Sequence, residues 1–131
     1  MSKVFGLTMT LLLGSILFAQ TPWVYRGESR WDPSWNGRPM PRAGACFFTD
    51  TNFQGNRFCV NAGDRLPALP GNFGDHISSM QLFGRTRAIV FNDRNFSGGS
   101  QEFRGSIADL RQAPFRDGHT WNDRISSVIV R

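Results

Sequence analysis

Two short stretches of the chain carry side chains that could bind a metal ion. Residues 74–79 read Gly-Asp-His-Ile-Ser-Ser, and residues 122–127 read Asn-Asp-Arg-Ile-Ser-Ser. Asp, Asn and Ser offer short oxygen-bearing side chains, which are the ligands that hard cations prefer. The same residue types also cap turns in many proteins, so the alternative is that both stretches only close loops.

Each of these stretches follows another repeated pattern. Residues 48–55 read Phe-Thr-Asp-Thr-Asn-Phe-Gln-Gly, and residues 91–98, 43 positions later, read Phe-Asn-Asp-Arg-Asn-Phe-Ser-Gly. Two markers that recur in the same order indicate a duplicated structural unit. The two aromatic residues of each copy are five positions apart, so a strand and a tight turn must fold back to bring them together.

Two residue types would hold such a folded hairpin in shape. Gly55 and Gly98 supply a backbone conformation with positive φ, which other residues reach only at a cost. A serine far downstream can close the hairpin by hydrogen bonds to backbone groups left free at the turn. Ser79 and Ser127 lie downstream of the first and the second copy of the pattern.

The sequence from residue 44 onward favours β-structure. Short apolar or alternating runs are separated by Gly, Asn, Asp and Pro, the residues typical of turns. The runs are residues 45–48, 57–60, 80–83, 88–91, 101–104 and 127–131. Residues 107–112 could form a helical turn, and residues 66–69 are the matching place in the first repeat. Several short strands with a twofold repeat predict a compact antiparallel β-sandwich.

The repeated pattern resembles the Greek-key signature of the βγ-crystallin family, over residues 44–131. The resemblance implies an all-β fold in which two Greek-key motifs form one βγ-crystallin-like antiparallel β-sandwich. The first motif would cover about residues 44–84 and the second about residues 87–131. Ser79 and Ser127 stand where the closing serine of that family stands, so the resemblance implies that they close the two hairpins. Residues 122–127 match in full the calcium-binding consensus of the microbial members, Asn/Asp–Asn/Asp–x–x–Ser/Thr–Ser.

The resemblance also implies the ligands of one or two Ca²⁺ ions, because the two motifs of such a domain face each other near a pseudo-twofold axis. The expected side-chain ligands are Asp75, Ser78, Asn122, Asp123 and Ser126, and the expected backbone carbonyls are those of Thr49, His76, Asn92 and Arg124. Gly74 departs from the consensus, so at least one site should be weaker. An ion that binds only the folded state would stabilise it.

The beginning of the chain is typical of a secretory signal peptide, residues 1–19. Lys3 provides the positive charge, residues 4–18 the apolar run, and Ala19 a small residue for cleavage. The run is shorter than a membrane span needs, and no second hydrophobic run follows. We therefore expect a secreted or periplasmic protein that has no membrane span after the signal is cleaved.

Residues 20–43 differ in composition from the rest of the chain. They contain four prolines and three tryptophans, Trp23, Trp31 and Trp35, without a period of 2 or 3.6. Proline at this density predicts a linker or extended arm without a regular element. The tryptophans could pack back on the domain or mark an arm that binds a partner.

The two cysteines lie on either side of the first predicted turn. On a hairpin, Cys46 and Cys59 would face each other across two strands, which favours a disulfide in an oxidising compartment. Two buried free thiols are the alternative. Two cysteines without a nearby histidine pair do not supply the ligand set of a metal site.

The charged residues do not indicate a nucleic-acid partner. The chain has 15 Lys and Arg against 10 Asp and Glu, but the arginines are spread singly from Arg26 to Arg131. Binding to a polyanion usually depends on a basic run or stripe, which is absent. We expect a monomer with a basic, solvated surface.

No set of residues in the sequence predicts catalysis. His76 lies inside a motif, His119 has no partner close in sequence, and no zinc-protease helix, nucleophile elbow, phosphate loop or paired-cysteine motif is present. Asp50 and Asp93 are equivalent in the repeat, and turn chemistry explains them better than a pair of catalytic carboxylates. We predict that the protein is not an enzyme. The phenylalanines read as core candidates: Phe47, Phe53, Phe58, Phe83, Phe96 and Phe103.

Two other functions remain open beside calcium binding. Some small secreted metalloproteinase inhibitors share a crystallin-like fold and carry disulfides, and a tied hairpin could present a rigid inhibitory surface. Against this, the sequence reveals no loop that must enter a protease cleft. The other alternative is a cell-surface interaction protein. The expected partners are therefore calcium and either a secreted protease or an envelope component.

Overall fold

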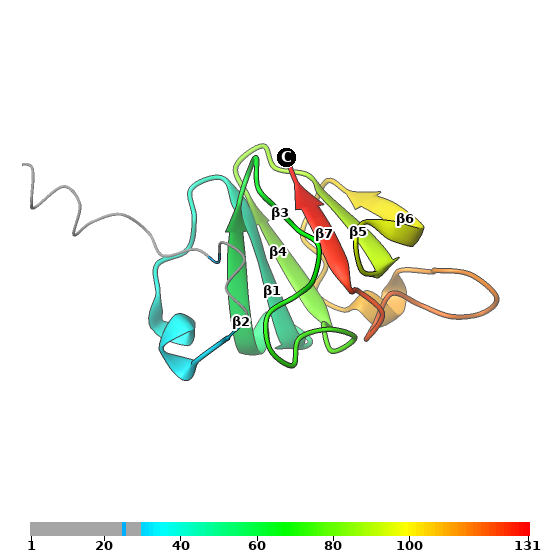
Figure 1. Ribbon diagram of the computed structural model, residues 1–131, viewed down its shortest axis with the longest axis horizontal. Helices are drawn as coiled ribbons and strands as arrows, with labels where there is room; N and C mark the ends of the chain where they lie inside the picture. Colours follow the sequence, from blue (N-terminus) through cyan, green and yellow to red (C-terminus); the bar gives the residue numbers. More distant parts are fainter. Residues whose placement is uncertain (1–24, 26–29) are drawn as a thin grey trace, which may run out of the picture.

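The computed structural model describes residue 25 and residues 30–131, and this part of the chain is all-β apart from two 3-10 helices (Figure 1). The predicted signal peptide and Trp23 lie outside the described residues. The strands are β1 (Gly44–Asp50), β2 (Gln54–Asn61), β3 (Arg65–Leu66), β4 (Ser79–Phe83), β5 (Ala88–Asp93), β6 (Ser97–Phe103) and β7 (Ser127–Val130); the 3-10 helices are η1 (Pro33–Gly37) and η2 (Leu110–Gln112). All six predicted runs fall on strands.

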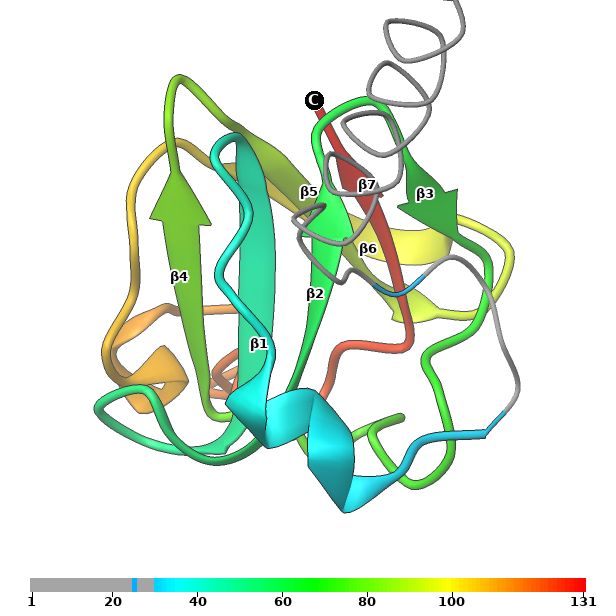
Figure 2. The same cartoon turned by 90° about the vertical axis from the view of Figure 1, so that its left-hand side faces the viewer.

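The strands form two antiparallel sheets, as the sequence predicts. One sheet has the order β2-β1-β4 and the other β3-β7-β5-β6 (Figures 1 and 2). In the first, Phe47 of β1 lies between Phe58 and Met80; in the second, Val90 of β5 lies between Gln101 and Val128. The two repeats therefore use the same strand arrangement.

Each repeat also lends a short segment to the sheet of the other. Strand β3 belongs to the first repeat but pairs with β7 of the second, with Leu66 opposite Val128. In return, Ile107 of the second repeat forms a bridge with Met80 of β4. This exchange binds the repeats into one domain.

The hydrophobic core lies between the sheets. Side chains alternate between the two faces of a strand, so one face of each hairpin is buried. Phe47, Phe58 and Phe103 are buried core residues, as expected. Phe53, Phe83 and Phe96 are only half-buried and lie outside the main core; Phe53 and Phe83 pack against the smaller cluster of Cys46, Phe48 and Cys59. Phe53 and Phe96 instead pack on the other aromatic residue of their own hairpin, with ring centroids 5.9 and 5.8 Å apart.

The folded hairpins have the geometry that the repeated pattern predicts. Gly55 and Gly98 have φ of 82° and 78°. The Ser79 hydroxyl donates to the carbonyl of Asp50 at 2.6 Å and accepts from the amide of Phe53 at 3.0 Å. Ser127 makes the same two bonds in the second repeat, also at 2.6 and 3.0 Å. The prediction that these serines close the hairpins is confirmed.

The segment before β1 is part of the packed structure. The expectation that it has no regular element is wrong at η1, where the Asp32 side chain caps the helix by accepting from the amide of Ser34. Trp35 and Tyr25 are buried in the core, with ring centroids 5.1 Å apart. Of the two alternatives for the tryptophans, packing on the domain holds for Trp35 and, half-buried, for Trp31.

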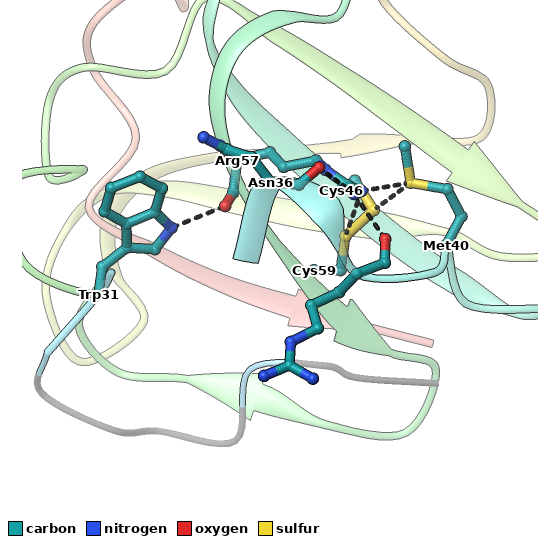
Figure 3. The surroundings of a disulfide bond; sticks show 7 residues. Trp31, Asn36, Met40, Cys46, Arg57 and Cys59 are labelled. Atoms are coloured by element: carbon teal, nitrogen blue, oxygen red, sulfur yellow. Dashed lines mark hydrogen bonds between the residues drawn. A yellow bond between two sulfur atoms is a disulfide. The ribbon is translucent and has the colours of Figure 1, made fainter. Parts of the chain in front are cut away.

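Arg57 of β2 fastens this segment to the first sheet (Figure 3). Its guanidinium is buried and donates from Nη2 to the carbonyls of Asn36 and Arg38, at 2.8 and 2.6 Å. Nη1 lies 2.7 Å from the Met40 sulfur. Burial lowers the pKa of Arg57. In return, the indole of Trp31 donates to the Arg57 carbonyl at 2.7 Å.

Cys46 and Cys59 face each other across β1 and β2 and form the expected disulfide (Figure 3). The bond lies on the face of the sheet turned away from the core, in a small cluster with Phe48. This disulfide joins the strands of the first hairpin. The second hairpin has no counterpart.

The helical turn expected at residues 107–112 is present as η2. The matching place in the first repeat, residues 66–69, is not helical, and Leu66 there belongs to strand β3. No helix in the described part of the chain is long and apolar enough to cross a membrane.

Candidate metal centre

The two oxygen-rich motifs pack against each other at the junction of the repeats. The amide of Asp75 donates to the carbonyl of Ile125 at 3.0 Å, and the amide of Asp123 donates to the carbonyl of Ile77 at 3.0 Å. Both aspartates have positive φ, 60° and 59°. This backbone conformation is uncommon outside Gly, Asn and Asp, which explains why aspartate suits both positions. The reciprocal bonds relate the motifs by a pseudo-twofold axis.

A second pair of backbone bonds sets each motif against a hairpin of its own repeat. The amide of Ser78 donates to the carbonyl of Phe48 at 2.9 Å, and the amide of Ser126 donates to the carbonyl of Phe91 at 2.8 Å. Thr49 and Asn92 immediately follow the two phenylalanines. In each repeat, the motif serine is therefore bonded to the residue just before the one whose carbonyl is an expected ligand.

Two surface pockets of equal volume, about 320 Å³ each, lie at this junction. We name them after the hairpin residue in each. The Asn92 pocket is lined by Asp75, Asn92, Asn122, Asp123 and Arg124. The Thr49 pocket is lined by Thr49, Asp50, Thr51, Ser78, Arg111 and Asn122.

Asn122 is shared by the two pockets and has an unusual side chain. Its Oδ1 atom is buried and has no hydrogen-bond partner. A buried carbonyl oxygen without a partner costs free energy, so proteins rarely leave one unpaired without a ligand or ion. An unpaired oxygen on a residue that lines both pockets fits a site for a hard cation.

The side chains of the two motifs also contact each other directly. The Ser126 hydroxyl donates to Oδ1 of Asp75 at 3.0 Å, joining two predicted ligands from different repeats. Within residue 25 and residues 30–131, no three His, Cys, Asp or Glu side chains converge. A metal here would therefore depend on serine, amide and backbone oxygens as well as carboxylates, a donor set that suits Ca²⁺ rather than a transition metal.

Most of the predicted ligands border one of the pockets, and their role as ligands stays a prediction. His76 and Ser126 border neither pocket; His76 is exposed, and Ser126 instead contacts Asp75. The space around Gly74 is open, since an added Cβ would meet no atom within 4 Å. Arg111, Asp50 and Thr51 border the Thr49 pocket although the sequence did not single them out as site residues. Nothing in the spacing of Arg111 could have indicated this place.

A hairpin of residues 113–121 stands out beside the junction and was also missed. Figure 1 shows it, in orange, extending away from both sheets. Pro114 bridges to Thr120, and the tip is closed by the bond from the His119 amide to the Arg116 carbonyl at 2.9 Å. The tip residues Asp117 and Gly118 both have positive φ, 54° and 78°. An Asp-Gly pair is a known signal for such a two-residue turn.

The hairpin is anchored at its base by aromatic packing. Trp121 is buried, and its indole donates to the Gln101 side chain at 2.8 Å. The Phe115 ring lies 4.6 Å from the Trp121 ring, and the guanidinium of Arg116 lies 4.7 Å above the centre of Phe115. These contacts give the exposed tip a defined position.

Comparison with protein families and solved structures gives one family model and several structures. The model described as peptidase inhibitor family I36 matches residues 39–101. No curated protein matches the chain.

A βγ-crystallin domain from Flavobacterium johnsoniae is 27% identical, with 66% of this chain and 92% of that chain covered and a TM-score of 0.55. A βγ-crystallin from Ciona intestinalis is 26% identical, with 67% and 99% covered and a TM-score of 0.54. The βγ-crystallin domain of Abundant Perithecial Protein from Neurospora crassa, solved in its Ca²⁺-bound form, is 21% identical, with 70% and 91% covered and a TM-score of 0.55.

Proposed function

The chain has the βγ-crystallin fold, and on that premise we propose that it binds Ca²⁺ between its two repeats and that the ion stabilises the folded domain. The observation that carries this proposal is the buried, unpaired Oδ1 of Asn122, a residue that lines both pockets. The proposed function is non-catalytic. It is also in keeping with the Neurospora crassa domain, whose structure is described as Ca²⁺-bound.

The residues around the Asn92 pocket would supply the ligands. Asp75 and Ser126 come from different repeats and lie 3.0 Å apart, so one ion could join both motifs. Asn122 and Asp123 add oxygens from the second motif, and Asn92 adds a hairpin carbonyl. Ca²⁺ accepts six to eight oxygens in flexible geometry, which suits a set made of carboxylate, amide, hydroxyl and backbone groups.

A bound ion would act by mass action. Because the ligands come from motifs almost 50 residues apart, the unfolded chain does not hold them together. An ion at about 100 times its dissociation constant would then stabilise the folded state by about 2.7 kcal/mol. For a small domain this is a large fraction of its stability.

Chemical denaturation with and without calcium tests the proposal. The unfolding midpoint of the protein should rise with calcium concentration in the millimolar range, the range usual for extracellular modules. The variant Asp123→Ala, Ser126→Ala should lose this dependence. An equal rise in both proteins, or none in either, would count against the proposed ligands.

We also propose that the protein is exported. The predicted signal peptide and the Cys46–Cys59 disulfide support this, because structural disulfides persist in oxidising compartments. Mass spectrometry of the protein recovered from the producing cells checks it. Export predicts a chain that begins near Gln20, and a reduced, full-length chain would contradict it.

We propose a peptidase inhibitor as the second candidate function. It is favoured by the family model that matches residues 39–101 and by the projecting hairpin of residues 113–121. A projecting, anchored hairpin can enter a concave partner at low entropic cost. Arg116 and Asp117 leave the hairpin without a net charge at its tip, and among the described residues Arg116 forms no ion pair, so its guanidinium is the group that an acidic specificity pocket could accept.

Peptidase assays separate the two functions. Purified protein would be titrated into a metallopeptidase (thermolysin) and a serine peptidase whose specificity pocket is acidic (trypsin). An inhibitor should reduce the activity of at least one in a saturable way, and Arg116→Ala should weaken the effect if the hairpin makes the contact. Unchanged activity of both enzymes at micromolar protein would remove this candidate for these two classes.

A further inference from the structure

Three sulfur atoms lie together on the outer face of the first sheet, where the segment before β1 meets the disulfide (Figure 3). The sulfur of Met40 is 3.5 Å from Sγ of Cys46, which is bonded to Cys59. Both cysteines are buried, whereas Met40 is 39% exposed. Met40 is therefore the member of this sulfur cluster that a reagent in solution reaches first.

The other methionine in the described part of the chain has the opposite environment. Met80 of β4 belongs to the core between the sheets and is 0% exposed. Oxidation of methionine to its sulfoxide turns an apolar side chain into a polar one. The core keeps an oxidant away from Met80 and has no place for the polar product. Neither restriction applies to Met40.

The Met40 sulfur also contacts a buried cation that lacks a strong acceptor. Arg57 is 7% exposed, and no carboxylate pairs with it among the described residues. Its Nη2 donates to two backbone carbonyls, but the neighbours of Nη1 are sulfur atoms, those of Met40 at 2.7 Å and Cys59 at 3.9 Å. Sulfur is a weak acceptor. Because a buried charge is costly unless its hydrogen bonds are made, an oxygen near Nη1 would stabilise this guanidinium.

We propose that Met40 is a site of oxidation by peroxides and that the oxygen of its sulfoxide becomes the acceptor for Nη1 of Arg57. In the reaction, the thioether sulfur gives an electron pair to one peroxide oxygen, so that an S–O bond forms and the O–O bond breaks. The proton on the transferred oxygen passes to the departing oxygen, which leaves as water. The sulfur is oxidised by two electrons and the peroxide is reduced by two.

The product fits the place where it forms. Methionine has three rotatable side-chain bonds, so Met40 can turn the new oxygen towards Arg57 without moving the backbone. A hydrogen bond from a charged donor to oxygen is stronger than the contact with sulfur that it replaces. Oxidation of Met40 therefore fastens the segment before β1 to the first sheet. The site lies apart from the repeat junction, and the inference does not depend on calcium binding.

Peptide mapping by mass spectrometry tests the modification itself. The full protein would be treated with hydrogen peroxide in the presence of a chelator, so that bound metal plays no part. Met40 should gain one oxygen while the fold is intact, and Met80 should react more slowly by at least about tenfold, because its oxidation requires the core to open. The variant Met40→Leu, which keeps the size of the side chain but cannot be oxidised, is the control.

Hydrogen exchange of residues 30–43 tests the new contact with Arg57. Exchange of these amides should be slower by about fivefold in the oxidised protein than in the untreated protein, the factor expected from one additional net hydrogen bond. Peroxide should not change the exchange of Met40→Leu. The variant Met40→Gln places an amide oxygen at a similar reach and should show the slow exchange without any oxidant.

Each result supports or overturns the inference. Equal oxidation rates of Met40 and Met80 in the folded protein would overturn the assignment of the site. Exchange of residues 30–43 that is unchanged or faster in oxidised protein, with Met40→Gln no slower than Met40→Leu, would overturn the contact with Arg57. Equal slowing on oxidation of Arg57→Leu, which has no donor, would also overturn it.

Discussion

The Ser126 hydroxyl donates a hydrogen bond to the Asp75 carboxylate at 3.0 Å, although the two residues are 51 positions apart in the sequence. This bond joins the motif of the second repeat to that of the first. Together with the reciprocal backbone bonds of Asp75 and Asp123, it places the oxygen-rich motifs at one junction. The duplication therefore produces one junction at which side chains from both repeats could bind the same ligand.

Ser79 and Ser127, which close the two hairpins, should stabilise the folded protein by similar amounts. Ser79→Ala removes a donor and an acceptor that satisfy two backbone groups of the first hairpin, and Ser127→Ala does the same in the second. Each substitution should lower the free energy of unfolding by about 1–3 kcal/mol, the range for leaving buried polar groups unpaired. Urea denaturation measures this. Ser97→Ala, at an exposed serine, is the control and should change the value little.

Arg57 should be required for docking of the segment before β1. Arg57→Lys replaces a planar fork that reaches two carbonyls, those of Asn36 and Arg38, by a single ammonium group. We expect the free energy of unfolding to fall by about 1–3 kcal/mol, because charge-assisted hydrogen bonds are lost. Limited proteolysis should then cut within residues 30–43 sooner than in the unaltered protein. Equal cleavage rates would contradict the role of Arg57 as a clamp.

The disulfide should stabilise the first hairpin. Cys46 and Cys59 are separated by 13 residues, and closing a loop of that length stabilises a protein by about 3 kcal/mol in the chain-entropy model. The double variant Cys46→Ala, Cys59→Ala leaves no free thiol. Its free energy of unfolding should be lower by about 3 kcal/mol, so its denaturation midpoint should fall. If the double variant and the unaltered protein unfold at the same midpoint, the bond has no such role.

The loss of stability on replacing a glycine by alanine should depend on the backbone φ of that glycine and on the room for a Cβ atom. Gly98 has φ of 78°, and an added Cβ would collide with the side chains of Asn92 and Asp93. Gly63 has φ of 99° with open space around it, and Gly105 has open space without a left-handed φ. Substitution by alanine should cost about 1–2 kcal/mol at Gly63, more at Gly98, and little at Gly105. The denaturation midpoint should be highest for Gly105→Ala, intermediate for Gly63→Ala and lowest for Gly98→Ala. Any other order would contradict this prediction.

The repeated fold could be predicted from the sequence because each hairpin is specified locally. Phe48, Phe53 and Gly55 recur as Phe91, Phe96 and Gly98, and the same local geometry follows from the same spacing. The cysteine pair could be predicted for the same reason, since its register depends only on the turn between the two cysteines.

The contacts of the segment before β1 could not be predicted in this way. The proline content correctly suggested irregular backbone, yet η1 forms because Asp32 caps it and Pro33 can start a helix. Trp35 enters the core and Arg57 binds the carbonyls of this segment only because the tertiary fold brings them together. Removing residues 20–43 is therefore expected to destabilise the domain as well as to remove an arm.

The charge of the candidate site was also hidden from the sequence. Arg111 lies outside both motifs in the sequence and reaches the Thr49 pocket through the position of η2. The hairpin at residues 113–121 had a local signal in Asp117 and Gly118, but its projection from the sheets depends on the anchor at Trp121. Local patterns predicted the motifs, and only the fold shows which residues border them.

The central claim, that the repeat junction binds calcium, is tested most directly by isothermal titration of Ca²⁺ into the metal-free protein beside its Asp123→Ala, Ser126→Ala variant. Our account predicts saturable binding of one ion, with a dissociation constant on the order of 10⁻⁴ to 10⁻³ M, that the variant loses. No binding in the millimolar range by either protein would contradict the account, and the two motifs would then serve only to close their turns.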